Sequence, residues 1–335
     1  MTDTTTQLPD VVNVLVLADI DDAEFQRIVD TGGARTRVER GKAPGDELEA
    51  QLQAAHVMYL GSSGQKDLRL HTRDLRWAHF NFAGVSNLRG GSWWEAPMTV
   101  TSSRGLNHPL PLAESVIAAV YMFARGMDLA VRNTDARDFK PASYGGAMLV
   151  SGKTIGIIGL GGIGQLVAQI AHGCGMRVVA SRRSAGERTE GVDGVDVLYP
   201  PSELHALLGE SDFVAVCAMS TPETTGMIDA ATITSMKDGA YVINVARGDL
   251  IVERALIEAL ESGKVAGAYL DVFGESIFGP PSGALQNAPN VVLAPHTSNR
   301  ADSPQSFSVD LFCDNLSCFL DGAPMKNVID WSRGY

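Results

Sequence analysis

A glycine-rich turn in the middle of the chain constrains its fold more than any other feature. An apolar run at 154–158 leads into glycines spaced as Gly-x-Gly-x-x-Gly, and residues 165–172 then carry apolar side chains at helical spacing. A buried strand, a glycine turn and a helix in this order are typical of a dinucleotide-binding unit. A glycine turn with no ligand is the alternative, but the flanking strand and helix favour binding. We therefore predict that the pyrophosphate of a dinucleotide lies at the start of this helix, against Gly159, Gly161, Gly162, Ile163 and Gly164.

The bulk composition bounds the size of the protein and its class of partner. The chain has 335 residues, of which 45% are apolar and 20% charged, and this is enough for two hydrophobic cores. With 27 basic and 39 acidic residues the formal net charge is −12. Such an acidic chain lacks the positive surface that binds a phosphate backbone, which argues against nucleic acid as a main partner.

The cysteines and the most apolar segments indicate the compartment. Cys174, Cys217, Cys313 and Cys318 show no Cys-x-x-Cys spacing, which argues against a zinc site or a disulfide framework and fits a reducing compartment. Residues 1–10 lack the basic segment of a signal peptide, and the apolar stretch at 112–124 is too short to cross a bilayer. The sequence predicts a cytoplasmic protein with no metal and no membrane association.

Strands and helices alternate on both sides of the glycine turn, which indicates α/β architecture. Before the turn, we predict strands at 11–18, 57–60, 75–80 and 98–101, and helices at 22–31, 47–55 and 112–125. The polar segment 132–150 is expected to be an extended arm or loop. From the turn onward, we predict strands at 154–158, 177–180, 213–217, 240–245, 265–270 and 291–294, with helices at 162–173, 202–208, 230–236, 253–262 and 303–320.

The position of the glycine turn predicts the domain organisation. Because the turn begins mid-chain, a first α/β unit precedes the dinucleotide domain, and the tail after 300 is too short to be a domain of its own. We predict two doubly wound parallel-sheet domains with a cleft between them: a flavodoxin-like substrate domain and a Rossmann dinucleotide domain. The substrate domain is expected to be discontinuous, at 1–108 and 299–335, with the dinucleotide-binding domain at 109–298.

The residues after the second strand of the dinucleotide unit indicate which dinucleotide binds. NAD-binding units place an acid there to accept hydrogen bonds from the ribose hydroxyls. Here Ser181, Arg182 and Arg183 follow the strand, and no acid occupies the position. Guanidinium groups suit a 2′-phosphate because they offer paired, charged donors. A solvated basic turn is the alternative; we predict that NADP(H) is preferred over NAD(H).

Three later strand ends carry residues suited to hydride-transfer chemistry on a keto acid. Arg247 follows one strand and can hold a planar carboxylate through two parallel hydrogen bonds. His296 follows another and is a natural acid/base near neutral pH. Asp271 ends the strand between them, and Glu275 lies four residues further on. A carboxylate beside His296 would raise its pKa. Each residue has a structural alternative, an ion pair or a turn, but together they indicate catalysis.

The sequence resembles the D-isomer-specific 2-hydroxyacid dehydrogenase family over nearly its whole length. The motifs that carry the resemblance are residues 152–164, Asn244-Val245-Ala246-Arg247-Gly248, Leu270-Asp271-Val272-Phe273 and Pro295-His296, with lesser landmarks at Ala83-Gly84-Val85 and Ala113-Glu114. The resemblance implies that Arg247 binds the substrate carboxylate, that His296 is the acid/base and that Asp271 contacts the nicotinamide amide. It also implies that Thr221 contacts the cofactor and that Gly61, Ser62, Gly84 and Val85 help to bind the substrate.

The resemblance further implies a homodimer, with the helix at 112–125 and the arm after it at the interface. The Ser-Arg-Arg segment is similar to that of NADP-using members, which are often glyoxylate or hydroxypyruvate reductases. In the family a catalytic Glu lies five residues after the strand-end Asp, where this chain has Ser276, and Glu275 is one residue early. We expect a loop shift that lets Glu275 pair with His296; loss of the partner is the alternative.

The sequence thus predicts an oxidoreductase that transfers a hydride between NADP(H) and a small 2-oxo or 2-hydroxy acid. The alternative is a dinucleotide-sensing regulatory or corepressor-type protein on the same fold, which Ser276 would favour. Oxidation of a non-carbon substrate is a third, weaker possibility.

Overall fold

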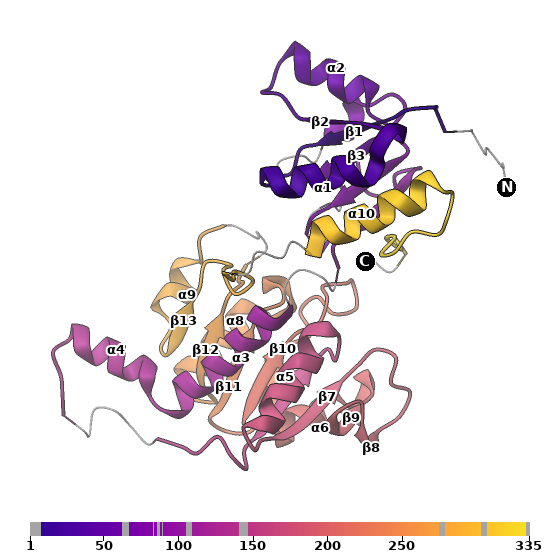
Figure 1. The fold of residues 1–335 in the computed structure, drawn as a ribbon. Coiled ribbons are helices and arrows are strands. Elements are labelled where there is room, and N and C mark those ends of the chain that lie inside the picture. Colours follow the sequence, from indigo (N-terminus) through magenta and orange to yellow (C-terminus); the bar gives the residue numbers. More distant parts are fainter. Residues whose placement is uncertain are drawn as a thin grey trace. The chain divides into compact units, whose positions relative to one another are not determined.

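The chain folds into two compact units that differ in their sheets. The computed structural model describes residues 8–61, 67–82, 84–85, 88, 90–104, 109–140, 147–274, 279–302 and 307–332. Unit 1 comprises Met1–Asn107 with Asp302–Tyr335, and unit 2 comprises His108–Ala301 (Figure 1). The chain therefore passes from unit 1 to unit 2 and back again.

Unit 1 contains a parallel five-stranded sheet in the order β2-β1-β3-β4-β5. Its strands are β1 (Val12–Val16), β2 (Thr36–Arg40), β3 (Val57–Leu60), β4 (Trp77–Phe80) and β5 (Thr99–Ser102), and its helices are α1 (Asp22–Gly32), α2 (Asp46–Ala54) and α10 (Phe307–Leu320). This is the strand order of flavodoxin-like folds, as predicted. β2 was missed because it is an edge strand with alternating exposed residues rather than an apolar run.

The C-terminal helix α10 completes the core of unit 1. Val309, Phe312 and Leu316 are buried against the β1 side of the sheet, and Phe312 stacks on Trp77 with ring centroids 4.8 Å apart. A helix almost 300 residues from β1 in the sequence thus covers the same sheet. The predicted helix at 303–320 is confirmed from Phe307 onward, and 303–306 lie outside the described residues.

A buried polar cluster joins α10 to the sheet of unit 1. The ring of His79 hydrogen-bonds Thr101 Oγ1 at 2.7 Å and Ser103 Oγ at 3.0 Å, and Ser103 Oγ lies 2.6 Å from Ser308 Oγ. Burial lowers the pKa of His79 to about 3, so the ring is neutral. The surrounding hydroxyls satisfy its nitrogens, which gives this histidine a structural role.

Unit 2 contains an eight-stranded sheet in the order β13-β12-β11-β10-β6-β7-β9-β8. Its strands are β6 (Thr154–Ile158), β7 (Arg177–Ser181), β8 (Thr189–Val192), β9 (Val195–Tyr199), β10 (Phe213–Val216), β11 (Ala240–Asn244), β12 (Val265–Leu270) and β13 (Val291–Leu293). All pairs are parallel except β8 with β9. Strands β6, β7, β9, β10, β11 and β12 follow the 3-2-1-4-5-6 order of the Rossmann fold, as predicted.

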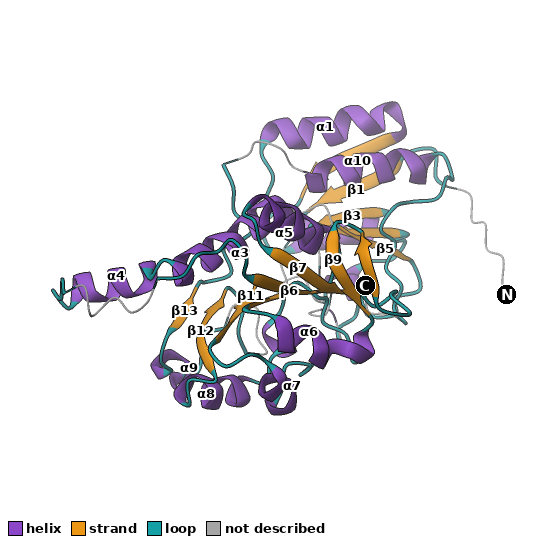
Figure 2. Ribbon diagram, turned by 90° about the horizontal axis from the view of Figure 1, so that it is seen from below, coloured by secondary structure: helices purple, strands orange, loops and turns teal. Residues whose placement is uncertain are grey.

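Helices cover both faces of the unit 2 sheet (Figure 2). One core lies under α3 (Pro109–Ala124) and α5 (Gly162–Gly173), and the other lies under α6 (Leu204–Glu210), α7 (Ala230–Ser235) and α8 (Glu253–Glu261). The short helix α9 (Gly283–Asn287) precedes β13. A parallel sheet buried on both faces explains why its strands appear in the sequence as continuous apolar runs.

The expected arm at 132–150 is wrong at its start. Met127–Asp135 forms the helix α4, which follows a left-handed break at Gly126 (φ 63°) and contains an ion pair between Asp128 and Arg132. This helix is hard to recognise from the sequence, because its apolar residues Met127 and Val131 are exposed instead of facing a core.

Within the described residues, no single helix is long and apolar enough to cross a membrane. Only Pro109–Ala124 and Met127–Thr134 taken together have the length and composition, and they are bent by 69°.

Candidate active site

The glycine turn after β6 uses its glycines in two ways. At Gly159 (φ 99°) a Cβ would lie 2.7 Å from the backbone of Ala218, and at Gly164 it would lie 2.3 Å from the carbonyl oxygen of Gly159. These two positions therefore admit no side chain. At Gly161 and Gly162 a Cβ would meet nothing within 4 Å, so the backbone there is open to close approach from outside. The arrangement fits a pyrophosphate, which needs access to bare backbone N–H groups.

The helix α5 begins inside this turn. Gly161 is its N-cap and offers no side chain to the first N–H groups, which leaves them directed at the open side. The N–H groups of Gly159 and Leu160 both donate to the carbonyl oxygen of Ser181 at 3.0 Å, which ties the turn to the end of β7. Ile163 is half-buried and packs on the core under α5.

The basic segment after β7 has a counter-ion that sequence reasoning missed. Arg182 Nη2 lies 2.8 Å from Asp193 Oδ2, and Asp193 belongs to the turn between β8 and β9. The Nε of Arg182 is buried and has no hydrogen-bond partner. Ser181 is the buried last residue of β7, and Arg183 is exposed. Arg182 is therefore not a freely solvated side chain of a basic turn.

Thr221 lies in a tightly bonded loop after β10. Its N–H donates to Thr224 Oγ1 at 2.8 Å, and Thr224 Oγ1 donates in turn to the carbonyl oxygen of Met219 at 2.7 Å. Ser220 Oγ donates to Asp249 Oδ2 at 2.6 Å, which joins this loop to the segment after Arg247. The close contact of Gly159 with Ala218 places the same loop against the glycine turn.

Arg247 follows β11 and is positioned by a buried asparagine. The amide of Asn244, which is fully buried, donates to the carbonyl oxygen of Arg247 at 2.8 Å and accepts from the N–H of Ala246 at 3.0 Å. The guanidinium Nη1 of Arg247 donates to the carbonyl oxygen of Ala246 at 2.7 Å. Burial lowers the pKa of Arg247, and the charge of Asp249 opposes that shift. The guanidinium remains charged near neutral pH because its ordinary pKa is so high.

Asp271 follows β12 and holds the loop that carries His296. Its buried carboxylate accepts from the N–H of Thr297 at 2.8 Å and from the N–H of Ser298 at 3.2 Å. The N–H of His296 donates to the carbonyl oxygen of Asp271 at 3.0 Å, and His296 adopts a positive φ of 54°. The Asp271 carboxylate is thus engaged by the chain itself, a role that the sequence did not reveal.

These residues meet because their strands are neighbours. β11, β12 and β13 are adjacent and parallel, so Arg247, Asp271 and His296 lie together at one carboxyl-terminal edge. The N–H of Asp271 also donates to the carbonyl oxygen of Asn244 at 3.0 Å. A Cβ on Gly248 would lie 2.3 Å from the carbonyl oxygen of Gly274, so the loops after β11 and β12 pack without space between them. The glycine turn after β6 lies at the same edge.

The predicted substrate-binding residues belong to unit 1. Gly61 follows β3, where a Cβ would lie 3.2 Å from Ala18 Cα, and half-buried Gly84 and buried Val85 come after the neighbouring β4. Ser62 and Glu275 lie outside the described residues, as does Ser276. Among the residues that the structure describes, no group of three His, Cys, Asp or Glu side chains is placed to hold a metal ion.

Comparison with known proteins decides the family. Residues 117–298, more than half of the chain, match the NAD-binding domain of the D-isomer specific 2-hydroxyacid dehydrogenases. The chain belongs to this family. The resemblance seen in the motifs is thereby confirmed, and the matched region contains the glycine turn, Arg247, Asp271 and His296.

Two curated relatives match this chain over about half of its length. A glyoxylate reductase of Korarchaeum cryptofilum is 38% identical over 184 residues, which are 54% of this chain and 53% of that protein. A hydroxypyruvate reductase of Blautia hydrogenotrophica is 38% identical over 180 residues, or 53% of this chain and 54% of that protein. The match thus spans about half the length of these curated relatives.

A solved structure matches over a longer stretch. A D-isomer specific 2-hydroxyacid dehydrogenase family protein from Aeromonas salmonicida has a TM-score of 0.80 at 28% identity. The match covers 96% of this chain and 99% of that one. The two-sheet α/β architecture is therefore shared with a family member over nearly the whole chain.

Proposed function

We propose that this protein is a 2-oxoacid reductase that also acts in reverse as a D-2-hydroxyacid dehydrogenase, with NADP(H) as its preferred cofactor. The observation that carries the proposal is the joint anchoring of Arg247, Asp271 and His296 at one edge of the sheet, beside an open glycine turn. The curated relatives that match half of their length are named as glyoxylate and hydroxypyruvate reductases, which supports small 2-oxo acids as substrates. Neither they nor the family match favours a dinucleotide-sensing regulatory protein.

The chemistry divides between two side chains. A bound nicotinamide dinucleotide supplies the hydride for the keto carbon in one direction and accepts it in the other. Arg247 binds the substrate carboxylate with parallel donors and so fixes the orientation of the carbonyl group. His296 donates a proton to the carbonyl oxygen during reduction and takes it back during oxidation. Thr221 and Asp271 contribute to cofactor binding, and Gly61, Ser62, Gly84 and Val85 to substrate binding. Glu275 remains the predicted carboxylate partner of His296.

NADP(H) preference rests on the segment after β7. Ser181, Arg182 and Arg183 offer a hydroxyl and two guanidinium groups where NAD-binding units have an acid. A 2′-phosphate carries more charge than a ribose hydroxyl and gains more from such donors.

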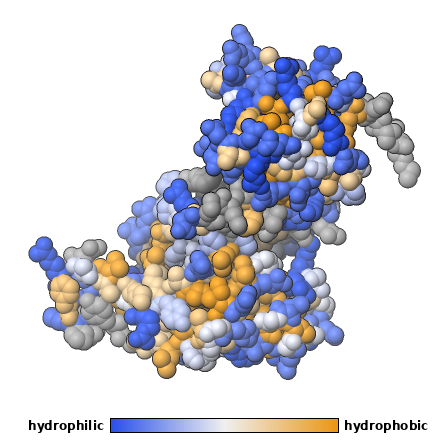
Figure 3. Space-filling model, in the orientation of Figure 1, coloured by the Kyte–Doolittle hydropathy of each residue, from blue (hydrophilic) through white to orange (hydrophobic). Residues whose placement is uncertain are grey.

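We further propose a homodimer formed through α3, α4 and the arm after α4. Apolar side chains gather over the face that carries α3 and α5 (Figure 3). Large apolar residues are exposed along these segments: Leu110, Tyr121, Met127, Val131, Phe139 and Leu149. A monomer rarely exposes so many along one surface. Sedimentation of the whole chain as a monomer at micromolar concentration would contradict this proposal.

The state of the cysteines bears on the location of the protein. The four thiols, none in a disulfide, support the cytoplasm as its location.

The activity is tested with NADPH and a panel of 2-oxo acids, namely glyoxylate, hydroxypyruvate and phenylpyruvate. We expect NADPH absorbance to fall with at least one of them, and not with acetone, which has the ketone but lacks the carboxylate that Arg247 binds. Tight NADPH binding without turnover of any 2-oxo acid contradicts the proposal.

A further inference from the structure

The hairpin β8–β9 adds the antiparallel strand β8 to the outer side of β9, which is the last of the six Rossmann strands in the sheet order. Val192 pairs with Val195, so Asp193 and Gly194 form a two-residue turn. Both have positive φ, 53° at Asp193 and 73° at Gly194. This is the geometry of a type I′ turn, for which Asp-Gly is a favoured pair. The turn therefore fixes the backbone from which the Asp193 side chain projects.

That carboxylate forms the ion pair with Arg182. The Nη2–Oδ2 distance is 2.8 Å, and the two side chains are 35% and 39% exposed, so the pair is partly shielded from solvent. The Nε of Arg182 is buried, so the guanidinium is only partly exposed to solvent. One of the two cations expected to bind a 2′-phosphate thus already has an anionic partner from its own chain.

A carboxylate at this position opposes the binding of a phosphate at Arg182. If the phosphate takes the same guanidinium edge, it must displace the carboxylate. If it takes another edge, two anions lie on one small cation and repel each other. Either way the cost falls on the phosphorylated cofactor alone, because the ribose hydroxyl of NAD(H) carries no charge.

We propose that Asp193 is a specificity-determining residue that competes with the cofactor 2′-phosphate for Arg182 and thereby limits the preference for NADP(H). This inference rests on the proposed role of Arg182 in NADP(H) binding. It assigns to the hairpin β8–β9 a function in cofactor selection that the glycine turn and the Ser-Arg-Arg segment do not indicate.

The variant Asp193→Asn isolates the charge. Asparagine has the same shape, keeps an oxygen that accepts from Arg182, and tolerates positive φ before glycine, so the turn is preserved. Glu190→Gln is the matched control, because it removes one carboxylate from an exposed position on β8 of the same hairpin. The readout is the dissociation constant of NADPH and of NADH, measured by fluorescence titration without substrate.

We expect Asp193→Asn to bind NADPH about two- to fivefold more tightly, the range of a partly exposed ion pair, with NADH unaltered. Glu190→Gln should bind both as the wild type does. In an Arg182→Gln background the effect of Asp193→Asn should vanish, since no contested guanidinium remains.

The outcomes separate this inference from the proposed function. The inference is overturned if Asp193→Asn binds NADPH no more tightly than the wild type, or if it tightens the binding of NADH equally. The NADP(H) assignment survives that result as long as Arg182→Gln weakens NADPH binding. If Arg182→Gln itself leaves NADPH binding unaltered, the NADP(H) assignment fails and the inference fails with it. Absence of 2-oxoacid turnover contradicts only the proposed reaction, because these titrations contain no substrate.

Discussion

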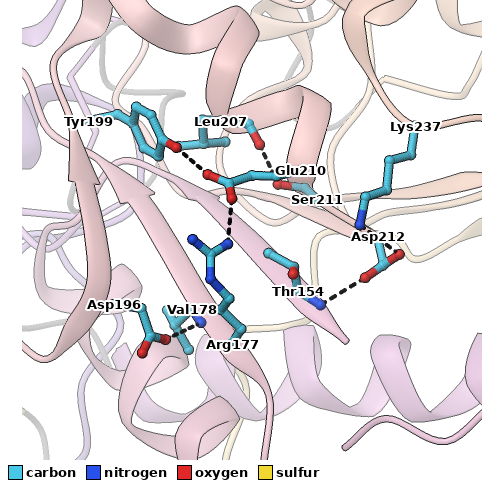
Figure 4. A network of polar contacts seen from close by, with 10 residues as sticks. All are labelled: Thr154, Arg177, Val178, Asp196, Tyr199, Leu207, Glu210, Ser211, Asp212 and Lys237. Atoms are coloured by element: carbon cyan, nitrogen blue, oxygen red, sulfur yellow. Dashed lines mark hydrogen bonds and ion pairs between the residues drawn. The ribbon is translucent and has the colours of Figure 1, made fainter. Parts of the chain in front are cut away.

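The two edges of the unit 2 sheet use polar residues in different ways. At the amino-terminal edge, charged side chains form ion pairs with one another: Glu210 pairs with Arg177, and Asp212 pairs with Lys237 at 3.1 Å while also accepting from the N–H of Thr154 at 2.8 Å (Figure 4). At the carboxyl-terminal edge, Asn244 and Asp271 bind the backbone of the loops. The amino-terminal edge thus contains ion pairs between side chains, whereas the polar side chains at the carboxyl-terminal edge fix loops that present other side chains.

The difference separates stability from function within one sheet. Partly exposed ion pairs contribute little each, because solvent screens them. Buried polar groups that bind backbone are costly to remove, since their partners are left unsatisfied. Arg182 is the exception at the carboxyl-terminal edge, because its guanidinium has a side-chain counter-ion there.

The largest contrast is expected at His296. His296→Asn removes the acid/base group while the backbone bond to Asp271 remains, so kcat for a 2-oxo acid should fall by about 10²- to 10⁴-fold. The binding of NADPH should be unaltered. Steady-state kinetics with a fluorescence titration checks this, and His172→Asn, on α5, is the matched control. Retention of more than half of kcat would exclude His296 as the acid/base.

A smaller effect is expected after β7. Arg182→Asp with Arg183→Ala should lower the NADPH-to-NADH ratio of kcat/KM by about 10- to 100-fold, through the loss of charge-assisted hydrogen bonds. Arg188→Ala, which removes a nearby cation stacked on the ring of Tyr199, should leave the ratio in place. An unchanged ratio in the double variant would remove the basis for the NADP(H) assignment.

Asn244 tests whether backbone anchoring positions Arg247. Asn244→Ala leaves the carbonyl oxygen of Arg247 and the N–H of Ala246 without their side-chain partner, so the free energy of unfolding should fall by about 1–3 kcal/mol. KM for the 2-oxo acid should rise as well. Asn287→Ala, which removes an exposed bond to Gly283 on α9, should alter neither. Denaturant unfolding measures the free energy of unfolding, and steady-state kinetics measures KM. A loss of stability with unaltered KM would show that Asn244 has a purely structural role.

The smallest effect is expected at the amino-terminal edge. Glu210→Gln should reduce the free energy of unfolding by no more than about 1 kcal/mol, because its pair with Arg177 is partly exposed. Burial and Glu210 raise the pKa of Tyr199 to about 12, and loss of the carboxylate should lower that pKa. Kinetics with NADPH and a 2-oxo acid should remain those of the wild type. A kinetic defect here would break the division between the two edges.

The sequence predicted those parts of the fold that depend on local pattern. The buried strands β6, β10, β11 and β12 are apolar runs, and the glycine turn has a spacing that backbone geometry requires. The edge strands β2 and β8 were missed, since an edge strand does not need an apolar run, and β9, which lies between β7 and β8, was missed as well.

The contacts of the candidate site were less predictable, because they depend on which strands become neighbours. Asn244, Asp271 and His296 lie far apart in the sequence and are linked only once β11, β12 and β13 are adjacent. The pairing of Arg182 with Asp193 depends on a hairpin that was not predicted. Local pattern thus identified the residues of the site but not the bonds that hold them.

Arg247→Lys tests most directly the claim that the carboxyl-terminal edge binds a 2-oxo acid. Lysine keeps the positive charge but cannot form two parallel hydrogen bonds to a carboxylate. KM for the most active 2-oxo acid should rise by about 10- to 100-fold, with NADPH binding unaltered and Glu210→Gln behaving as the wild type. Wild-type KM and kcat in Arg247→Lys would contradict the account.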